Sequence, residues 1–146
     1  MAGKPSQTAE DYLERIHELI EEKGYARVVD IASSLNITQA SVTNMVQKLG
    51  DMGFVNYEKY RGLILTDEGR EIAKKIQRRH ETLARFFSLL ELDEETQAKD
   101  IEGIEHHLSP ATFRMLEDLS TFFEEQPNVL KKFLAFREGR EKKPRS

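Results

Sequence analysis

Apolar residues recur at helical spacing through the first 50 residues, with polar residues between them. The first stripe predicts a helix over residues 8–23 that ends at Gly24, because glycine readily adopts the left-handed conformation that closes a helix. A short helix is predicted next, from Val28 to Leu35. Thr38 is a favourable N-cap for a third helix, which we expect to run from Gln39 to about Leu49.

The spacing of apolar residues changes after Gly53. Two short apolar segments, at residues 54–57 and 63–65, enclose a polar turn from Glu58 to Gly62. Such segments on either side of a glycine-containing turn are typical of a β-hairpin. We therefore expect a two-stranded hairpin after the third helix.

Helical spacing returns at Thr66, which we expect to cap a long helix. A further helix is predicted over about 94–108, another begins with Pro110 at its first position, and a last one follows Pro127. The seam of the long helix consists of Ile72, Ile76, Leu83, Phe87 and Leu90. The last helix carries Val129, Leu130, Phe133, Leu134 and Phe136.

These elements predict a mainly α fold in two parts. The first is an N-terminal winged helix-turn-helix domain with a two-stranded wing, over residues 1–70. The second is an all-helical domain over residues 71–146. The final stretch, Arg137–Ser146, is basic, and we expect it to be frayed.

The helix-turn-helix prediction depends on a few residues between 29 and 45. Ala32 is small where two helices cross, and Asn36 is one of the few non-glycine residues that tolerate a left-handed turn. Ile37, Val42 and Met45 are expected to pack the second helix of the motif onto the first. The alternative is an ordinary pair of helices whose polar face only contacts solvent. The β-hairpin that follows at the distance expected for a wing argues against this alternative.

The outward residues of this motif are suited to DNA. Short polar side chains on the second helix can reach base edges and phosphates in a major groove, and the hairpin tip can lie over the sugar-phosphate backbone. On the helix these residues are Gln39, Ser41, Thr43, Asn44, Gln47 and Lys48. At the tip they are Lys59, Tyr60 and Arg61.

Composition narrows the class of protein. The 146 residues are 38% hydrophobic and 33% charged, and they include no cysteine, so no disulfide framework or cysteine-type zinc site is expected. No apolar run approaches the length of a membrane span, and no secretory signal is apparent. A cytoplasmic protein is therefore favoured. The net charge of −4 is unusual for a DNA-binding protein, but residues 10–22 carry much of the acidity and residues 23–65 are slightly basic.

A second group of residues has the chemistry of a metal site. On the helix predicted to reach residue 108, Glu102, Glu105 and His106 project from one face, as a metal half-site requires. Asp11 and Glu14 share a face of the first helix. The ordinary alternative for both groups is a solvated acidic face.

Other residues near these positions leave alternatives open. His80 lies in the seam of the long helix, where it is either a ligand or a satisfied core histidine. Glu10, His17 and Glu18 lie near enough to Asp11 and Glu14 that spacing alone does not select among them. We expect His107 to point away from the other three residues of its segment.

Five segments together resemble the diphtheria-toxin-repressor family of metal-dependent transcriptional regulators, most closely its manganese transport regulator branch. They are EDYLERIHELIEEKGYARVVDIA, SVTNMVQKL, YEKYRGLILTDEG, the histidine of RRHETL, and DIEGIEHHLS. Taken in this order, the segments cover about the first 125 residues.

The resemblance implies a homodimer with a central helical dimerisation domain and a winged helix at each end. It implies a repressor that binds double-stranded operator DNA of manganese uptake genes when two Mn²⁺ ions occupy each subunit. The metal ligands it implies are Asp11, Glu14, His80, Glu102, Glu105 and His106. Asp11 and Glu102 stand where other members have methionine and cysteine, and hard oxygen ligands favour Mn²⁺, although other divalent metals can bind.

Three alternatives remain at this point. The regulator could respond to another divalent metal such as iron, or to an organic ligand. A di-metal carboxylate oxidase is the third, but such sites draw on two Glu-x-x-His motifs, and the chain has only Glu14 to His17. We therefore expect no enzymatic activity, no small organic substrate and no membrane partner.

Overall fold

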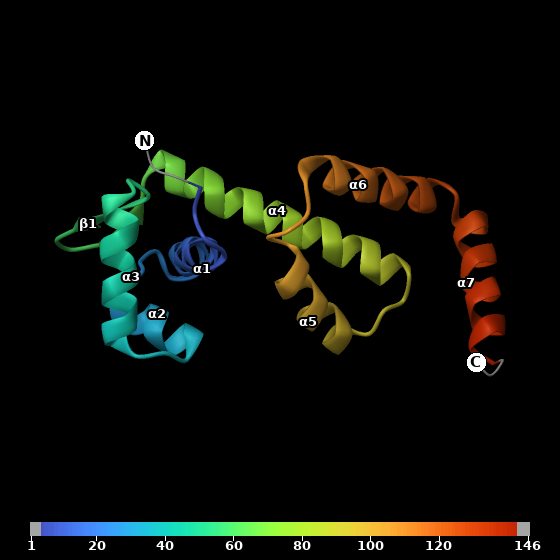
Figure 1. The fold of residues 1–146 in the computed structure, drawn as a ribbon, viewed down its shortest axis with the longest axis horizontal. Coiled ribbons are helices and arrows are strands. Elements are labelled where there is room, and N and C mark those ends of the chain that lie inside the picture. The colour runs from blue at the N-terminus through green and yellow to red at the C-terminus, as the bar shows by residue number, and fades with distance from the viewer. Residues whose placement is uncertain (1–3, 143–146) are drawn as a thin grey trace. The chain divides into compact units, whose positions relative to one another are not determined.

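The computed structural model describes residues 4–142, which form seven helices and a two-stranded sheet (Figure 1). In chain order they are α1 (Gln7–Lys23), α2 (Val28–Leu35), α3 (Gln39–Asp51), β1 (Val55–Glu58), β2 (Gly62–Leu65), α4 (Asp67–Leu89), α5 (Glu94–Ile104), α6 (Pro110–Glu125) and α7 (Pro127–Glu141). The predicted mainly α fold with a two-stranded wing is confirmed. None of the helices in the described range has the length and apolar composition needed to cross a bilayer.

The chain divides into two compact units, one up to Arg78 and one from Arg79 onward. The division lies inside α4, because this helix runs through both units. The boundary predicted near residue 70 lies in the first turn of the same helix.

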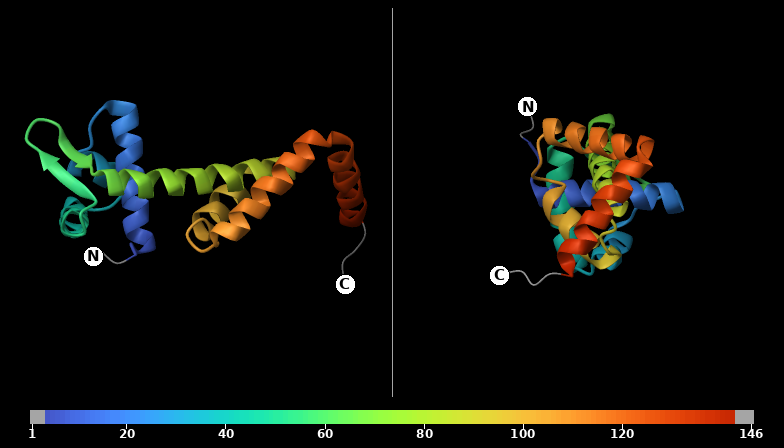
Figure 2. Two further views of the ribbon diagram at one scale, coloured as in Figure 1. Left: turned by 90° about the horizontal axis from the view of Figure 1, so that it is seen from above. Right: turned by 90° about the vertical axis from the view of Figure 1, so that its right-hand side faces the viewer.

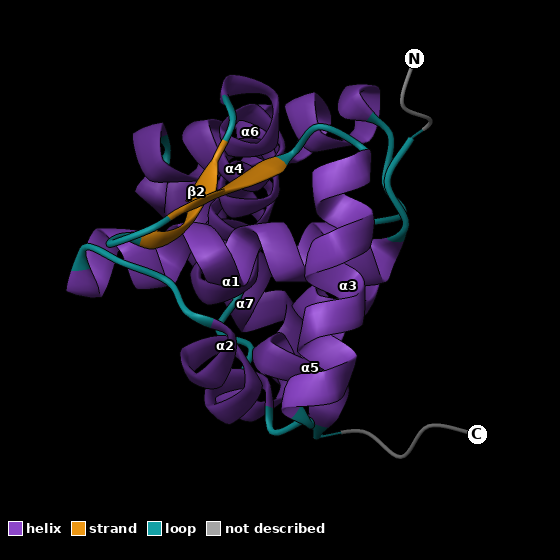
Figure 3. Cartoon of the chain, turned by 90° about the vertical axis from the view of Figure 1, so that its left-hand side faces the viewer, coloured by secondary structure: helices purple, strands orange, loops and turns teal. Residues whose placement is uncertain are grey.

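The first unit has a continuous apolar core to which α1, α2, α3, the beginning of α4 and the hairpin contribute. Figure 3 shows the backbone of these helices and of the hairpin. Leu13 and Ile16 of α1, Ile31 of α2, and Val42 and Leu49 of α3 are fully buried in it. This core therefore fixes the helix-turn-helix to the first helix. Burial of apolar surface contributes about 25 cal/mol of stabilising free energy for each Å² removed from water.

The turn between α2 and α3 has the predicted left-handed residue. Asn36 has φ 56° and ψ 49°, and Ala32 is buried. Val42 is buried and Met45 packs against the core, but the prediction that Ile37 packs there is wrong, since this residue is 39% exposed. The Ile37 N–H donates to the carbonyl of Ala32 at 3.0 Å, so the main chain of Ile37 closes the turn while its side chain faces solvent.

The wing is an antiparallel pair in which Val55 faces Leu65 and Glu58 faces Gly62. Its turn is shorter than predicted, because Glu58 and Gly62 belong to the strands. The wing is joined to the segment before α2 by a 2.9 Å hydrogen bond from the Leu63 N–H to the Ala26 carbonyl. Gly62 lies at this junction with φ +80°, and a Cβ there would lie 2.6 Å from the Ala26 oxygen.

The second unit has a smaller core of Leu83, Ile101 and Phe113. The Arg85 guanidinium of α4 binds the Glu124 carboxylate of α6 at 2.8 and 3.0 Å, and this hydrogen bonding lowers the pKa of Glu124 and raises that of Arg85. The helix α7 begins at Pro127, shortly after the end of α6, and has no buried residue. Figure 2 shows these two helices in orange and red. Part of the predicted basic tail belongs to α7, and residues 143–146 lie outside the described range.

We expect Gly62→Ala to lower the free energy of unfolding by at least about 1–2 kcal/mol, the cost of a left-handed non-glycine residue, because the new Cβ also meets the Ala26 oxygen. Urea denaturation followed by circular dichroism measures this. Gly50→Ala is the matched control in the same unit: Gly50 lies in α3 with room for a Cβ, so this change should stabilise the chain by about 0.5–1 kcal/mol. Equal effects of the two changes would contradict the argument.

Candidate metal centre and nucleic-acid interface

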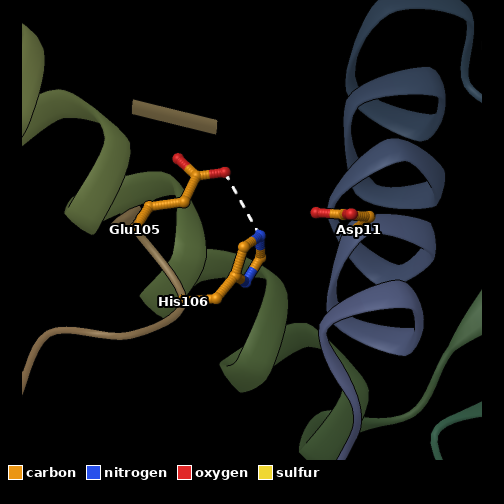
Figure 4. A group of neighbouring side chains, drawn as sticks. All are labelled: Asp11, Glu105 and His106. Carbon is orange, nitrogen blue, oxygen red and sulfur yellow. Dashed lines mark ion pairs between the residues drawn. The ribbon is translucent and has the colours of Figure 1, made fainter. Parts of the chain in front are cut away.

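In the second unit, the Glu105 carboxylate faces two imidazoles. Its Oε2 lies 3.1 Å from Nδ1 of His80, and its Oε1 lies 3.5 Å from Nε2 of His106 (Figure 4). The side chains of Glu105 and His106 are only 4% and 1% exposed, whereas that of His80 is 52% exposed. Three predicted ligands from two separate segments thus come together at one partly accessible position.

The turn after α5 brings Glu105 and His106 to this position. Glu105 is the C-cap of α5, and the His107 N–H bonds to the Ile104 carbonyl at 3.0 Å. Ser109 then adopts the extended conformation of an N-cap before Pro110, and the residue before a proline disfavours the helical region. The predicted helix to about residue 108 is wrong, because α5 ends at Ile104.

This shorter helix changes the relation between the predicted ligands. Glu102 is exposed on α5, while Glu105 is buried in the turn. The prediction that Glu102, Glu105 and His106 project from one helical face is therefore wrong in its geometry. His107 is exposed, as expected of a residue that points away from this group.

His80 is not a core histidine, although its position in the apolar seam left that alternative open. Half of its side chain is exposed, and its ring contacts the buried carboxylate. The neighbouring seam residues Ile76 and Leu83 are fully buried, as predicted. The polar contact with Glu105 therefore explains a histidine at a position where an aliphatic residue is the default.

The first unit carries Asp11 and Glu14 one turn apart on α1. Both are half-buried, and the Asp11 carboxylate projects from the helix in Figure 4. The nearby His17 is buried, and its Nε2 lies 3.7 Å from Glu21 of the same helix. Its ring is therefore engaged within α1.

The chemistry of these side chains fits a hard divalent cation. The candidate donors are carboxylate oxygens and imidazole nitrogens, and the whole chain lacks cysteine. Oxygen ligands suit Mn²⁺, and imidazole ligands suit later transition metals as well. A buried carboxylate that faces two imidazoles has the donors such an ion requires.

The outward face of α3 has the predicted composition. Gln39, Ser41, Thr43, Asn44, Gln47 and Lys48 are all exposed. The hydroxyl of the N-cap Thr38 accepts a hydrogen bond from the Ser41 N–H at 3.2 Å and donates one to the Ser41 hydroxyl at 2.9 Å. The Ser41 side chain thus takes part in helix capping, whereas the longer polar side chains of this face extend into solvent.

The wing tip presents two different cations. Lys59 lies 5.5 Å from the ring of Tyr60, which is 85% exposed, while the Arg61 guanidinium is paired with Glu58 at 3.2 Å. Arg27 was not identified from the sequence. It is exposed, and with Lys59 and Tyr60 it lines a cavity of about 510 Å³ beside the wing. Its position directly before α2 is the sequence feature that points to it.

Two family models match successive parts of the chain. Residues 4–63 match the iron dependent repressor N-terminal DNA binding domain, and residues 66–134 match the iron dependent repressor metal binding and dimerisation domain. Together the two models cover most of the chain.

Individual proteins agree with the family models. The chain is 53% identical over 116 residues to the HTH-type transcriptional regulator MntR of Bacillus subtilis (strain 168), covering 80% of this chain and 82% of that protein. It is 47% identical over 131 residues to MntR of Lysinibacillus sphaericus (strain C3-41), covering 90% and 94%.

Solved structures share the fold. The manganese regulator SloR superposes with a TM-score of 0.70 at 26% identity over 82% of this chain, and T. acidophilum IdeR with 0.68 at 29% identity over 79%. This chain spans 55% of each of those two longer chains.

Proposed function

The chain belongs to the iron dependent repressor family, and we propose that it is a manganese-responsive transcriptional repressor that binds operator DNA as a homodimer. The family consists of DNA-binding regulators, so the oxidase alternative is set aside. Relatives named MntR, at about half identity over most of the chain, support manganese over iron. We propose a cytoplasmic location and control of manganese uptake genes.

The observation that carries this proposal is the buried Glu105 carboxylate between the imidazoles of His80 and His106. We propose that these three residues, together with Asp11, Glu14 and Glu102, hold two Mn²⁺ ions in each subunit. Glu102 is exposed on α5, so its carboxylate is accessible to a cation from solvent. The absence of sulfur ligands supports Mn²⁺ on chemical grounds.

Charge explains why these ligands can act as a switch. Asp11, Glu14, Glu102 and Glu105 would repel one another if the proposed site gathered them in ionised form. Two divalent cations, when bound, supply four positive charges and bonds to both segments. Because α1 belongs to the DNA-binding unit and Glu105 to the other unit, these side chains would then restrain one unit relative to the other.

The DNA-binding part of the proposal follows from the exposed polar face of α3. Dimeric helix-turn-helix proteins place two such helices about 34 Å apart in successive major grooves. Restraint of each winged helix favours that spacing without any contact between metal and DNA. We propose that α3 contacts bases and that Lys59, Tyr60 and Arg61 contact the backbone.

Exposed apolar side chains in the second unit support the homodimer. Apolar groups that stay accessible in one subunit are typical of surfaces buried by association. On α6 and α7 they are Met115, Phe122, Val129, Phe133 and Phe136. A second copy of the chain would cover such residues.

The proposal predicts that Mn²⁺ raises the affinity of the dimer for a palindromic operator by about 5- to 150-fold, the usual range of allosteric coupling. A gel shift with Mn²⁺, Fe²⁺ or a chelator measures this. Stronger stimulation by Fe²⁺ would favour the iron alternative. Equal binding in Mn²⁺ and in chelator would contradict metal control and favour an organic ligand.

His106→Ala should weaken Mn²⁺ binding by on the order of 100-fold or more, since it removes a proposed metal ligand and not merely a residue that orients a ligand. Mn²⁺-dependent DNA binding should be lost with it. His107→Ala is the matched control, because His107 is the exposed neighbour and should leave both unchanged. Circular dichroism verifies that both variants fold. The ligand assignment fails if His106→Ala retains wild-type Mn²⁺ affinity.

Lys59→Ala should weaken binding to all DNA sequences and reduce the slope of log K against log salt by about 1, as the loss of a phosphate contact does. Arg61→Ala should have the smaller effect, since Glu58 already pairs with this guanidinium. Salt-dependent binding isotherms for both variants test this. A changed base preference with an unchanged salt slope would contradict a backbone role for the wing.

A further inference from the structure

Arg79 contacts both sides of the connection that carries Glu105 and His106. Its Nη1 donates a hydrogen bond to the Glu105 carbonyl at 3.3 Å, and its guanidinium carbon lies 5.0 Å from the centre of the Phe113 ring. Glu105 is the C-cap of α5, and Phe113 is a buried residue near the start of α6. One side chain of α4 therefore binds the end of one helix and the beginning of the next.

The hydrogen bond satisfies a group that the helix itself leaves without a partner. The last carbonyls of a helix have no N–H of the same helix to accept from, and a positive charge near them is favourable. The planar guanidinium can donate at its edge while its face lies on an aromatic ring, which a lysine ammonium does not reproduce. Arg79 thus suits this turn better than other cationic residues.

Arg79 and His80 are consecutive residues of α4 that bind different parts of one glutamate. Arg79 binds the main-chain carbonyl of Glu105, and His80 contacts its carboxylate. Main chain and side chain of Glu105 are therefore both fixed against the same helix.

We propose that Arg79 is a positioning residue for the metal centre. It orients the turn so that the Glu105 carboxylate and the His106 imidazole face the position of the bound cation. This inference rests on the proposed function. Outer partners that orient metal ligands commonly change metal affinity by about 10- to 100-fold when they are removed.

Arg85 provides a matched control on the same helix. Its guanidinium binds Glu124 at 2.8 Å and the Thr121 hydroxyl at 3.1 Å, both on α6. Replacement of Arg85 therefore removes an α4 arginine that makes at least as many hydrogen bonds as Arg79. Unlike Arg79, Arg85 makes these bonds to α6 and not to the turn that carries Glu105 and His106. Arg79→Met and Arg85→Met both keep an apolar stem and lose the donors.

The test is a Mn²⁺ titration of the full-length protein in which electron paramagnetic resonance measures free Mn²⁺. We expect Arg79→Met to bind Mn²⁺ about 10- to 100-fold more weakly than the wild type, and Arg85→Met to bind it as the wild type does. Arg79→Lys keeps the charge and a hydrogen-bond donor but loses the planar guanidinium that lies on the Phe113 ring. We therefore expect a smaller loss of Mn²⁺ affinity than in Arg79→Met.

Wild-type affinity in Arg79→Met, or an equal loss in Arg85→Met, overturns the role of Arg79 and leaves the proposed function intact. Absence of Mn²⁺ binding by the wild-type chain instead contradicts the proposed function. If circular dichroism shows that Arg79→Met is unfolded, Arg79→Lys decides: weaker binding supports the proposal, and wild-type affinity overturns it.

Discussion

The burial of the Glu105 carboxylate is the constraint on which the second unit depends. A carboxylate removed from water is costly unless charged or hydrogen-bonding partners compensate for the lost hydration. Here the partners are imidazoles from α4 and from the adjacent residue, and the main chain of the same glutamate is bound by Arg79. The α5–α6 connection is therefore held to α4 by polar contacts of both the main chain and the side chain of Glu105.

The two units differ in how far they are stabilised by their own cores. The first unit buries apolar residues from four helices and both strands, as a structure that must present a fixed surface to DNA requires. Among the described residues of the second unit, the buried apolar cluster consists of Leu83, Ile101 and Phe113, and several aromatic rings of α6 and α7 stay accessible. Its stability therefore depends more on association and on the polar centre, and in such proteins folding and assembly are linked by mass action.

Local chemistry accounts for what the sequence could predict. Gly24, Asn36 and Thr38 end or begin helices through interactions within a few residues, and each has the predicted role. The end of α5 was missed because the backbone turns just after the C-cap Glu105, where the His107 N–H bonds to the Ile104 carbonyl three residues back, and apolar spacing carries no signal for this turn. The bond from Arg79 to Glu105 spans 26 residues, and no pattern within a single helix predicts which arginine of α4 makes it. The burial of Glu105 beside the exposed Glu102 likewise depends on tertiary packing.

The overall negative charge of the chain is compatible with DNA binding because the charges are unevenly distributed. Salt screens exposed charges over about 8–10 Å, so the local surface of α3 and the wing matters more than the total. The acidic residues of α1 carry the same sign of charge as phosphate, and they include two of the proposed ligands, Asp11 and Glu14. Cation binding there would remove repulsion and restrain the winged helix in the same event. By thermodynamic linkage, DNA binding must then tighten cation binding by the same factor.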